Sequence, residues 1–184
     1  MAKFFDHIND KIKKFISEQH IFFVSTAPDN GRINLSPKGM DSFRVLGDNK
    51  VAFLNVTGSG NETAAHLVQN SRMTIMFCSF TASPLILRLY GQGQAIHDYD
   101  ANWDEMLALF PPIIGARQVI VCDVESVQTS CGYAVPRMDF REERQTLIKW
   151  TEAKSDDQLQ IYWEQKNVTS IDGDPTFLLE KRSE

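Results

Sequence analysis

Glycine, hydroxyl and amide residues gather between residues 51 and 67, VAFLNVTGSGNETAAHL, in an order that favours binding of an anion. The apolar run 51–56 predicts a buried strand, and it ends at two glycines that allow backbone shapes closed to other residues. A helix is expected from Glu62, and its first turn leaves N–H groups free at the positive end of the helix dipole. The stretch therefore predicts a phosphate site made of backbone donors and of Thr57, Gly58, Ser59, Asn61 and Thr63.

This glycine turn differs from two familiar phosphate-binding sequences. No Lys-Ser or Lys-Thr pair follows the glycines, which excludes the P-loop for nucleoside triphosphates. The pattern Gly58-x-Gly60-x-x-Thr63 lacks the third glycine of the dinucleotide-binding fingerprint. An ordinary strand-to-helix turn with a polar cap also explains these residues, so the local pattern leaves both interpretations open.

Residues 32–38 alternate strictly between polar and apolar side chains and predict a strand with two different faces. Ile33 and Leu35 lie on one face. The other face carries two cations, an amide and a hydroxyl but no acid: Arg32, Asn34, Ser36 and Lys38. Such a set is suited to a phosphate or to the polar edge of a heterocycle, and a face turned to water is the alternative. Pro37 indicates an edge strand or the end of the strand.

Arg88 is the one charged side chain inside the apolar run 85–91, which predicts a central strand. A buried arginine needs a carboxylate or a bound anion as its partner. A structural salt bridge is the commoner explanation, and a bound anion is the functional one.

Strands and short helices would position these residues. Helices are expected over residues 4–18, 102–110, 141–152 and 156–167, the last capped by Ser155. Strands are expected over 20–26, 32–38, 43–46, 51–56, 72–78, 118–129, and 85–91 with its continuation to residue 99. A bend is expected at Gly91-Gln92-Gly93. Because strands come first and helices cluster at the end, the chain predicts a mainly β, α+β fold: an antiparallel barrel of about six strands with helices around it.

The composition predicts a single globular domain over residues 1–184, with a strand-rich core over about 20–133 and a helical segment over about 139–167. With 19 Lys and Arg against 24 Asp and Glu, the net charge of −5 argues against a nucleic-acid partner. No apolar run reaches membrane-spanning length. The three cysteines include no Cys-x-x-Cys pair, and we expect no metal site and a cytoplasmic location.

The placed segments resemble the pyridoxamine 5′-phosphate oxidase-like flavoproteins, which have an FMN-binding split β-barrel fold. The resemblance runs from about His20 to Tyr133. It depends on the string GRINLSPKG at residues 31–39, on Phe53-Leu54 before the glycine turn, and on Leu89-Tyr90-Gly91. The strings TGSGNETAAHL and SCGYAVP are similar to an uncharacterised branch of that family. The resemblance implies a homodimer with FMN bound at two sites between the subunits.

The same resemblance implies roles for individual residues. Asn34, Ser36 and Lys38 would contact the flavin, backbone atoms of Phe53 and Leu54 would meet its ring edge, and residues 57–63 would lie at the phosphate. The family's oxidase carries an Arg-Lys pair at the helix start, where this chain has Glu62-Thr63. The phosphate would therefore depend on hydroxyls, backbone donors and an arginine such as Arg72 or Arg88.

We therefore expect an FMN-dependent oxidoreductase of unknown small-molecule substrate, with its catalytic residues unassigned. Oxidation of pyridoxamine phosphate itself is not expected, because the C-terminal arginine and histidine that the oxidase uses for its substrate's phosphate have no counterpart in this sequence. The alternative is a non-catalytic flavin-binding or sensor module, which the sequence does not separate from an enzyme.

Overall fold

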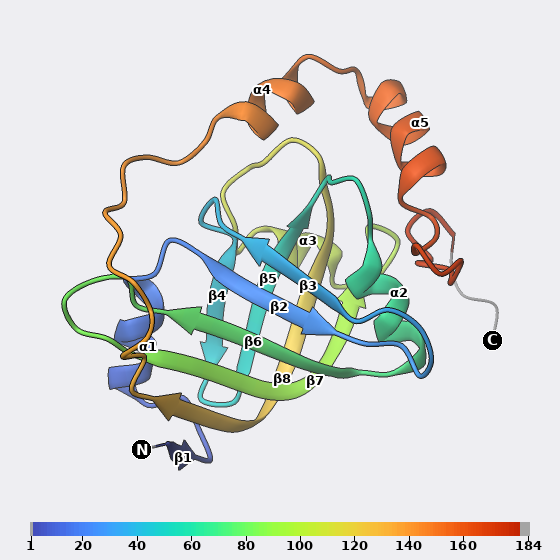
Figure 1. Cartoon of the computed structure of the whole chain (residues 1–184). Helices are drawn as coiled ribbons and strands as arrows, with labels where there is room; N and C mark the ends of the chain where they lie inside the picture. The colour runs from blue at the N-terminus through green and yellow to red at the C-terminus, as the bar shows by residue number, and fades with distance from the viewer. Residues whose placement is uncertain (1, 181–184) are drawn as a thin grey trace.

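An antiparallel sheet of eight strands carries the fold in the computed structural model, which describes residues 2–180 (Figure 1). Its longest strand, β8 (Ala116–Ser130), organises the others. β8 pairs from Val119 to its end with β7 (Ile86–Ile96), through its first half with β5 (Lys50–Val56), and near its end with β1 (Lys3–Phe5). Since β5 and β8 are covered on both faces over residues 51–55 and 117–122, their sequences there read as nearly continuous apolar runs.

The remaining strands extend this sheet toward two edges. They are β2 (Phe22–Thr26), β3 (Asn34–Lys38), β4 (Phe43–Gly47) and β6 (Arg72–Cys78). The order is β3-β2-β6-β7-β8-β5-β4, and among the described residues no backbone ladder joins edge strand β3 to edge strand β4. The prediction of an antiparallel α+β fold is confirmed. The sheet is, however, not a closed barrel, and it has eight strands where about six were expected.

The N-terminal helix is shorter than its periodicity predicted. Residues 3–5 form β1, and α1 spans only Asp10–Ser17. Asn9 caps this helix, because its side-chain oxygen accepts a hydrogen bond from the Ile12 N–H at 3.1 Å. Phe4 and Phe5 fit the same 3.6-residue spacing as the helix residues that follow, so the apolar pattern alone did not reveal the boundary.

Four further helices surround the sheet: α2 (Glu62–Gln69), α3 (Trp103–Leu107), α4 (Thr146–Glu152) and α5 (Asp156–Lys166). The expected capping box at Ser155 is present at the start of α5. Residues 141–145, expected to be helical, have no regular structure, so α4 begins only at Thr146. The segment that contains α4 and α5 runs as an arch around one side of the sheet in Figure 1. None of the described helices combines the length and apolarity that a membrane crossing requires.

Two apolar clusters fill the fold. The larger lies between the sheet and α1 and includes Phe22, Phe53 and Phe77, and the smaller lies under α3 around Leu54 and Val119. The expected bend in β7 is a β-bulge, because its register with β8 shifts between Tyr90 and Gly91. A Cβ at Gly91 would collide with the Asp123 carbonyl, so only glycine fits there.

Candidate functional site

A cavity of about 460 Å³ lies between β3 and the start of α2. The polar face of β3 lines it, while Ile33 and Leu35 point outward and are 76% and 65% exposed. The apolar face of this strand is therefore the one turned to the surface. The described residues at the cavity wall include Ser36, Lys38, Leu54, Asn55, Thr57, Gly58, Ser59, Gly60, Asn61, Glu62, Thr63, Arg117 and Leu147.

Lys38 enters the cavity from the last position of β3. Its Nζ donates to the Asn55 Oδ1 at 3.0 Å and lies 5.8 Å from the centre of the Phe53 ring. Burial, with a smaller contribution from the charge of Arg117, lowers the pKa of Lys38 from 10.5 to about 8.

Arg117 is the second cation at this cavity, and the sequence analysis did not identify it. Its side chain comes from the start of β8, is 3% exposed, and donates through Nη1 to the Gly60 carbonyl oxygen at 3.1 Å. Its Nε has no hydrogen-bond partner among the described residues, and burial lowers its pKa to about 10. Within residues 2–180, no carboxylate forms an ion pair with Arg117 or Lys38. A signal was available, since Arg117 and Gln118 come just before the buried apolar run 119–122.

The structure brings most of the predicted site residues together. Eight line the cavity: Ser36, Lys38, Leu54, Thr57, Gly58, Ser59, Asn61 and Thr63. Asn34 lies behind this wall, where its Nδ2 donates to the Thr63 Oγ1 at 3.1 Å and its Oδ1 accepts from the Ser36 hydroxyl. Phe53 is fully buried beside Lys38.

Neither arginine suggested for the phosphate reaches this cavity. Arg88 is half-buried on β7, where its Nη1 donates to the Ser130 Oγ at 3.4 Å. Arg72 is exposed on β6, and its Nε donates to the Asn70 Oδ1. The cation that accompanies Lys38 is Arg117 instead.

The glycine turn is held in place by the C-terminal segment. The Trp163 Nε1 donates to the Thr57 Oγ1 at 2.9 Å, and the Asn167 Nδ2 donates to the Gly58 carbonyl oxygen at 3.0 Å. The Asn61 Nδ2 in turn donates to the Asn167 carbonyl oxygen at 3.3 Å and caps no N–H of α2. The Thr57 and Asn61 side chains, expected to be ligand donors, are thus engaged within the protein.

Glu62 is turned toward the same segment. Its carboxylate oxygens accept from the Ile171 N–H at 3.1 and 3.2 Å, and the Nε2 of the buried His66 lies 3.9 Å from one of them. The negative charge at the start of α2 is therefore compensated by the chain's own backbone. What remains for a ligand is two cations, the Ser59 hydroxyl and the backbone of the turn.

Residues 8–131 match the family model described as pyridoxamine 5′-phosphate oxidase. The chain belongs to this family. It is 42% identical over 151 residues to the pyridoxamine 5′-phosphate oxidase family protein ustO of Aspergillus flavus. That alignment covers 79% of this chain and 61% of the relative, so the chain spans only part of the relative's length.

Solved structures share the fold of the family at low sequence identity. The HupZ protein of Group A Streptococcus superposes with a TM-score of 0.51 at 20% identity, over 65% of this chain and 91% of that one. A Clostridium acetobutylicum protein related to general stress protein 26 superposes with a TM-score of 0.50 at 15% identity, over 66% and 86% of the two chains.

The match to the pyridoxamine 5′-phosphate oxidase family ends before the segment that holds the glycine turn. Trp163, Asn167 and Ile171 all lie beyond residue 131, whereas both cations and the turn lie within the matched range. The site therefore lies within the matched range, and the residues that fasten its glycine turn lie beyond that range.

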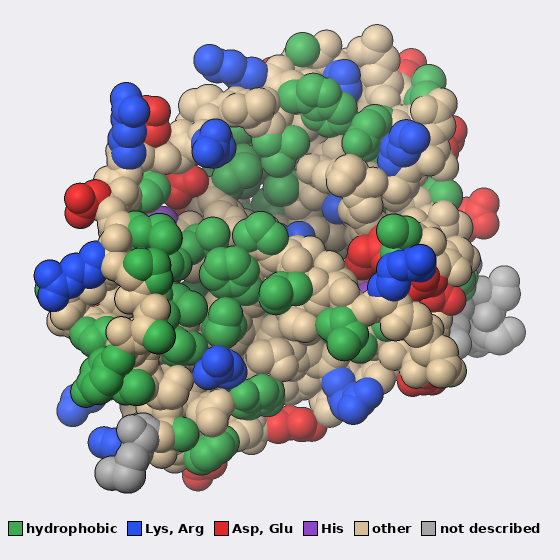
Figure 2. Space-filling model, in the orientation of Figure 1, with side chains coloured by type: hydrophobic (Ala, Val, Ile, Leu, Met, Phe, Trp, Pro, Cys, Tyr) green, Lys and Arg blue, Asp and Glu red, His purple; other side chains and the backbone are tan. Residues whose placement is uncertain are grey.

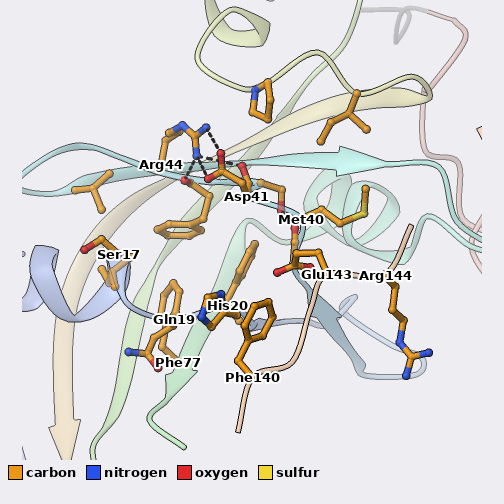
Figure 3. Close-up of a pocket in the computed structure, with 18 of the residues that line it drawn as sticks. Ser17, Gln19, His20, Met40, Asp41, Arg44, Phe77, Phe140, Glu143 and Arg144 are labelled. Carbon is orange, nitrogen blue, oxygen red and sulfur yellow. Dashed lines mark hydrogen bonds and ion pairs between the residues drawn. The ribbon is translucent and has the colours of Figure 1, made fainter. Parts of the chain in front are cut away.

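A larger cavity of about 1,100 Å³ lies beside the first and shares Gly39, Met40 and Ser42 with it (Figure 3). Phe22, Phe43 and Phe77 form its apolar floor and pack with ring centres 4.9 to 5.6 Å apart. On another side, Phe140 stacks on His20 at 3.7 Å, and Figure 3 shows these two rings side by side.

The turn between the two cavities has an unusual backbone. Met40 and Asp41 have φ values of 64° and 53°, a conformation that costs residues with a side chain roughly 1–2 kcal/mol each. Arg44 holds the turn, because its Nη1 and Nη2 donate to the two Asp41 carboxylate oxygens at 2.8 and 3.1 Å (Figure 3). Such strain is typical of ligand-binding sites.

Proposed function

We propose that this protein is an FMN-dependent oxidoreductase acting on a small molecule that is still to be identified. One observation carries the proposal: the half-buried Lys38 and the buried Arg117 line one cavity beside the start of α2, and no carboxylate of residues 2–180 forms an ion pair with either. Two desolvated cations are costly unless an anion accompanies them. Membership of the pyridoxamine 5′-phosphate oxidase family supports a flavin phosphate as that anion.

In this proposal the phosphate lies between Arg117, Lys38 and the backbone of residues 58–61. The unpartnered Nε of Arg117 gives this cation a donor that the protein leaves unused among its described residues. The flavin ring lies along the inward face of β3, next to Ser36 and Asn34, with Phe53 and Leu54 behind it. Bound FMN would supply hydride or electron transfer, and the chain would supply orientation and exclusion of water.

Oxidation of pyridoxamine phosphate is not the activity that we propose. The helix start carries Glu62-Thr63, where the family's oxidase has two cations, and Glu62 and Thr63 both accept hydrogen bonds from the chain itself. The larger cavity is our candidate site for the reaction partner, because it adjoins the flavin site at Met40 and presents three phenyl rings. We therefore expect an apolar or aromatic substrate or electron donor.

A homodimer is part of the proposal. Leu35 on edge strand β3 and Ile33 just before that strand expose apolar side chains, and hydrophobic side chains gather on the same side of the molecule in Figure 2. Exposed apolar residues on a sheet edge favour association. A monomer by light scattering, at concentrations where FMN is bound, would contradict this part. Replacement of Leu35 by Lys is expected to weaken the dimer.

Purification without added cofactor tests the function. We expect a yellow protein, or a colourless one that takes up one FMN per chain on titration. A colourless protein that binds no FMN would rule the proposal out.

The alternative is a flavin-binding module without turnover. It is favoured by the shortage of free proton-transfer groups at the smaller cavity, where Glu62 is already engaged by the Ile171 N–H. Stopped-flow reduction by NADH or NADPH separates the two, because rapid flavin reduction counts against a binding-only role.

A further inference from the structure

A chain of buried amides connects Lys38 to His97, which directly follows the end of β7. The Lys38 Nζ donates to the Asn55 Oδ1 at 3.0 Å, and the Asn55 Nδ2 donates to the Gln118 Oε1 at 3.0 Å. The Gln118 Nε2 lies 3.4 Å from the His97 Nδ1. Asn55 and Gln118 are 2% and 0% exposed, and His97 is 8% exposed, so bulk water cannot replace these partners.

Chemistry fixes the direction of every hydrogen bond in this chain. An ammonium only donates, so the oxygen of Asn55 must face Lys38. On the other branch, a carbonyl oxygen only accepts, so the Asn61 Nδ2 faces the Asn167 carbonyl and the Asn61 oxygen faces Asn55. Both hydrogens of the Asn55 amide are then used, one toward Asn61 at 3.1 Å and one toward Gln118.

The protonation state of His97 follows from this direction. Since the oxygen of Gln118 accepts from Asn55, its nitrogen faces His97 and donates to Nδ1. The Nδ1 must therefore be an acceptor, which requires a neutral imidazole with its proton on Nε2. A protonated ring would place two donors against each other.

The other groups around His97 also bear on its charge. The Tyr99 ring stacks on the imidazole at 4.9 Å, and burial raises the pKa of the Tyr99 phenol to about 12. Asp98 and Asp100 favour the charged imidazole, and Asp100 accepts the His97 backbone N–H at 2.8 Å. Burial outweighs these carboxylates, and the pKa of His97 lies below its ordinary 6.5.

We propose that His97 is a positioning residue for Lys38, which holds the ammonium in place for the anion only while the imidazole is neutral. The position of Lys38 at an anion site follows from the geometry of the cavity, and only the identity of that anion as FMN rests on the proposed function. Protonation of His97 would reverse the Gln118 amide, so that the Gln118 NH₂ group would face the Asn55 NH₂ group. The Asn55 amide would lose its acceptor at Gln118 and would hold its oxygen less firmly toward Lys38, and the anion would bind more weakly.

The first test uses the cofactor-free protein and does not depend on flavin. Nitrogen-15 NMR of the histidine rings distinguishes the two neutral tautomers, and we expect His97 to carry its proton on Nε2 near neutral pH. His97→Gln offers an acceptor oxygen to Gln118 but does not titrate. The side-chain NMR signal of Lys38 should shift over the pH range in which His97 takes up its proton in the native chain, and it should not shift over that range in His97→Gln. A His97 proton on Nδ1, or a Lys38 signal that is indifferent to the titration of His97, would overturn the proposal.

The second test follows FMN affinity as the pH falls from neutrality. A phosphate monoester itself takes up a proton at about pH 6, so the comparison is between variants rather than between pH values. The native protein should lose affinity more steeply than His97→Gln, while the two should agree within about threefold at neutral pH. His7→Gln, at the exposed N-terminal side, is the matched control and should retain the native profile.

The variant Gln118→Met tests whether His97 acts on Lys38 through the Gln118 amide or by a direct effect of its own. It removes the amide between His97 and Asn55 while keeping an unbranched side chain of similar size, and thermal unfolding establishes whether the variant is folded. We expect FMN affinity to fall about tenfold and the response to His97 protonation to disappear. Identical pH profiles in the native protein, His97→Gln and Gln118→Met would refute the proposed coupling of His97 to Lys38 through the two amides. Absence of FMN binding in the native protein and in both variants would refute only the proposed function. The role of His97 would still be decided by the NMR test on the cofactor-free protein.

Discussion

Lys38 on β3 and Arg117 on β8 line one cavity beside the glycine turn, although these strands are not neighbours in the sheet. Burial is the main cause that lowers the pKa of Lys38 there, and repulsion from the like charge of Arg117 is the second. An anion bound between them would relieve that repulsion and satisfy the free Nε of Arg117. The pair thus favours the ligand-bound state over the empty one.

Replacement of Lys38 by Ala is expected to weaken FMN binding by roughly one to two orders of magnitude, since a charge-assisted contact contributes about 1.5–3 kcal/mol. Quenching of flavin fluorescence on titration measures the dissociation constant. Lys50→Ala is the matched control, because Lys50 is exposed and its Nζ lies 3.4 Å from the Asp123 carboxylate. Equal affinities for the native protein and Lys38→Ala would exclude Lys38 as a ligand.

Replacement of Arg117 by Gln should cost a similar factor and reduce the preference for FMN over riboflavin, which lacks the phosphate. The reason is that Arg117 lies against Gly58 and Gly60, where the phosphate is proposed. Arg72→Gln and Arg88→Gln should retain native affinities, since neither arginine lines the cavity. If riboflavin and FMN bind equally well to the native protein, the glycine turn binds no phosphate.

Lys38 makes the stability of the cofactor-free protein depend on pH. Its folded pKa of about 8 lies below the ordinary 10.5, so above pH 8 the unfolded chain binds more protons on this residue than the folded chain. The free energy of unfolding should therefore rise with pH through Lys38, and the full cost of its charge is present below pH 8. Urea denaturation between pH 7 and 9 measures this rise.

Lys38→Met is the control for that experiment. It should be more stable than the native protein at pH 7, and it should lack the rise toward pH 9. Above the ordinary thiol pKa of 9.0, Cys122 acts in the opposite direction, because burial raises its folded pKa to about 12. A difference between native and Lys38→Met stabilities that stays constant with pH would contradict the depressed pKa.

Glu62→Ala should leave FMN affinity unchanged or slightly increased, because a negative charge near the phosphate is removed. It should also lower the free energy of unfolding by about 1–3 kcal/mol, since the Ile171 N–H loses a charged acceptor. Glu62→Gln keeps an acceptor and should restore most of that stability. A large loss of FMN affinity in both variants would show that the carboxylate serves the ligand.

Arg44→Lys should destabilise the turn between the two cavities although it keeps the charge. A lysine cannot donate to both carboxylate oxygens of Asp41 at once, so the strained backbone of Met40 and Asp41 loses its clamp. We expect a loss of about 1–2 kcal/mol in unfolding free energy by urea denaturation. Lys13→Arg, where a single exposed contact to Asp48 suffices, is the control and should be neutral.

Local patterns predicted the elements around the site but not its complete chemistry. Alternation in residues 32–38 separated the two faces of β3, and the glycines marked the turn before α2. The alternation could not say which face is buried, and here the polar face is the inner one because it borders the cavity.

The two arginines Arg88 and Arg117 illustrate a second limit of the sequence patterns. Arg88 stood out because its neighbours in sequence are apolar, yet its own side of β7 is only half-buried. Arg117 was overlooked because the strand was expected to begin at Gln118, whereas β8 begins at Ala116 and includes Arg117. Its burial comes from the turn and from segments far along the chain, which only the tertiary fold brings together.

The fastening of the glycine turn by Trp163 and Asn167 sets the order of events during synthesis. These hydrogen bonds span 106 and 109 residues of chain. At ~5–20 residues per second, the ribosome needs about 5–20 s after Thr57 is added before Trp163 is made. The strands can therefore assemble while the turn is still unfastened. Under the proposed function, stable binding of the flavin would then be a late step of maturation, after the C-terminal segment has been made.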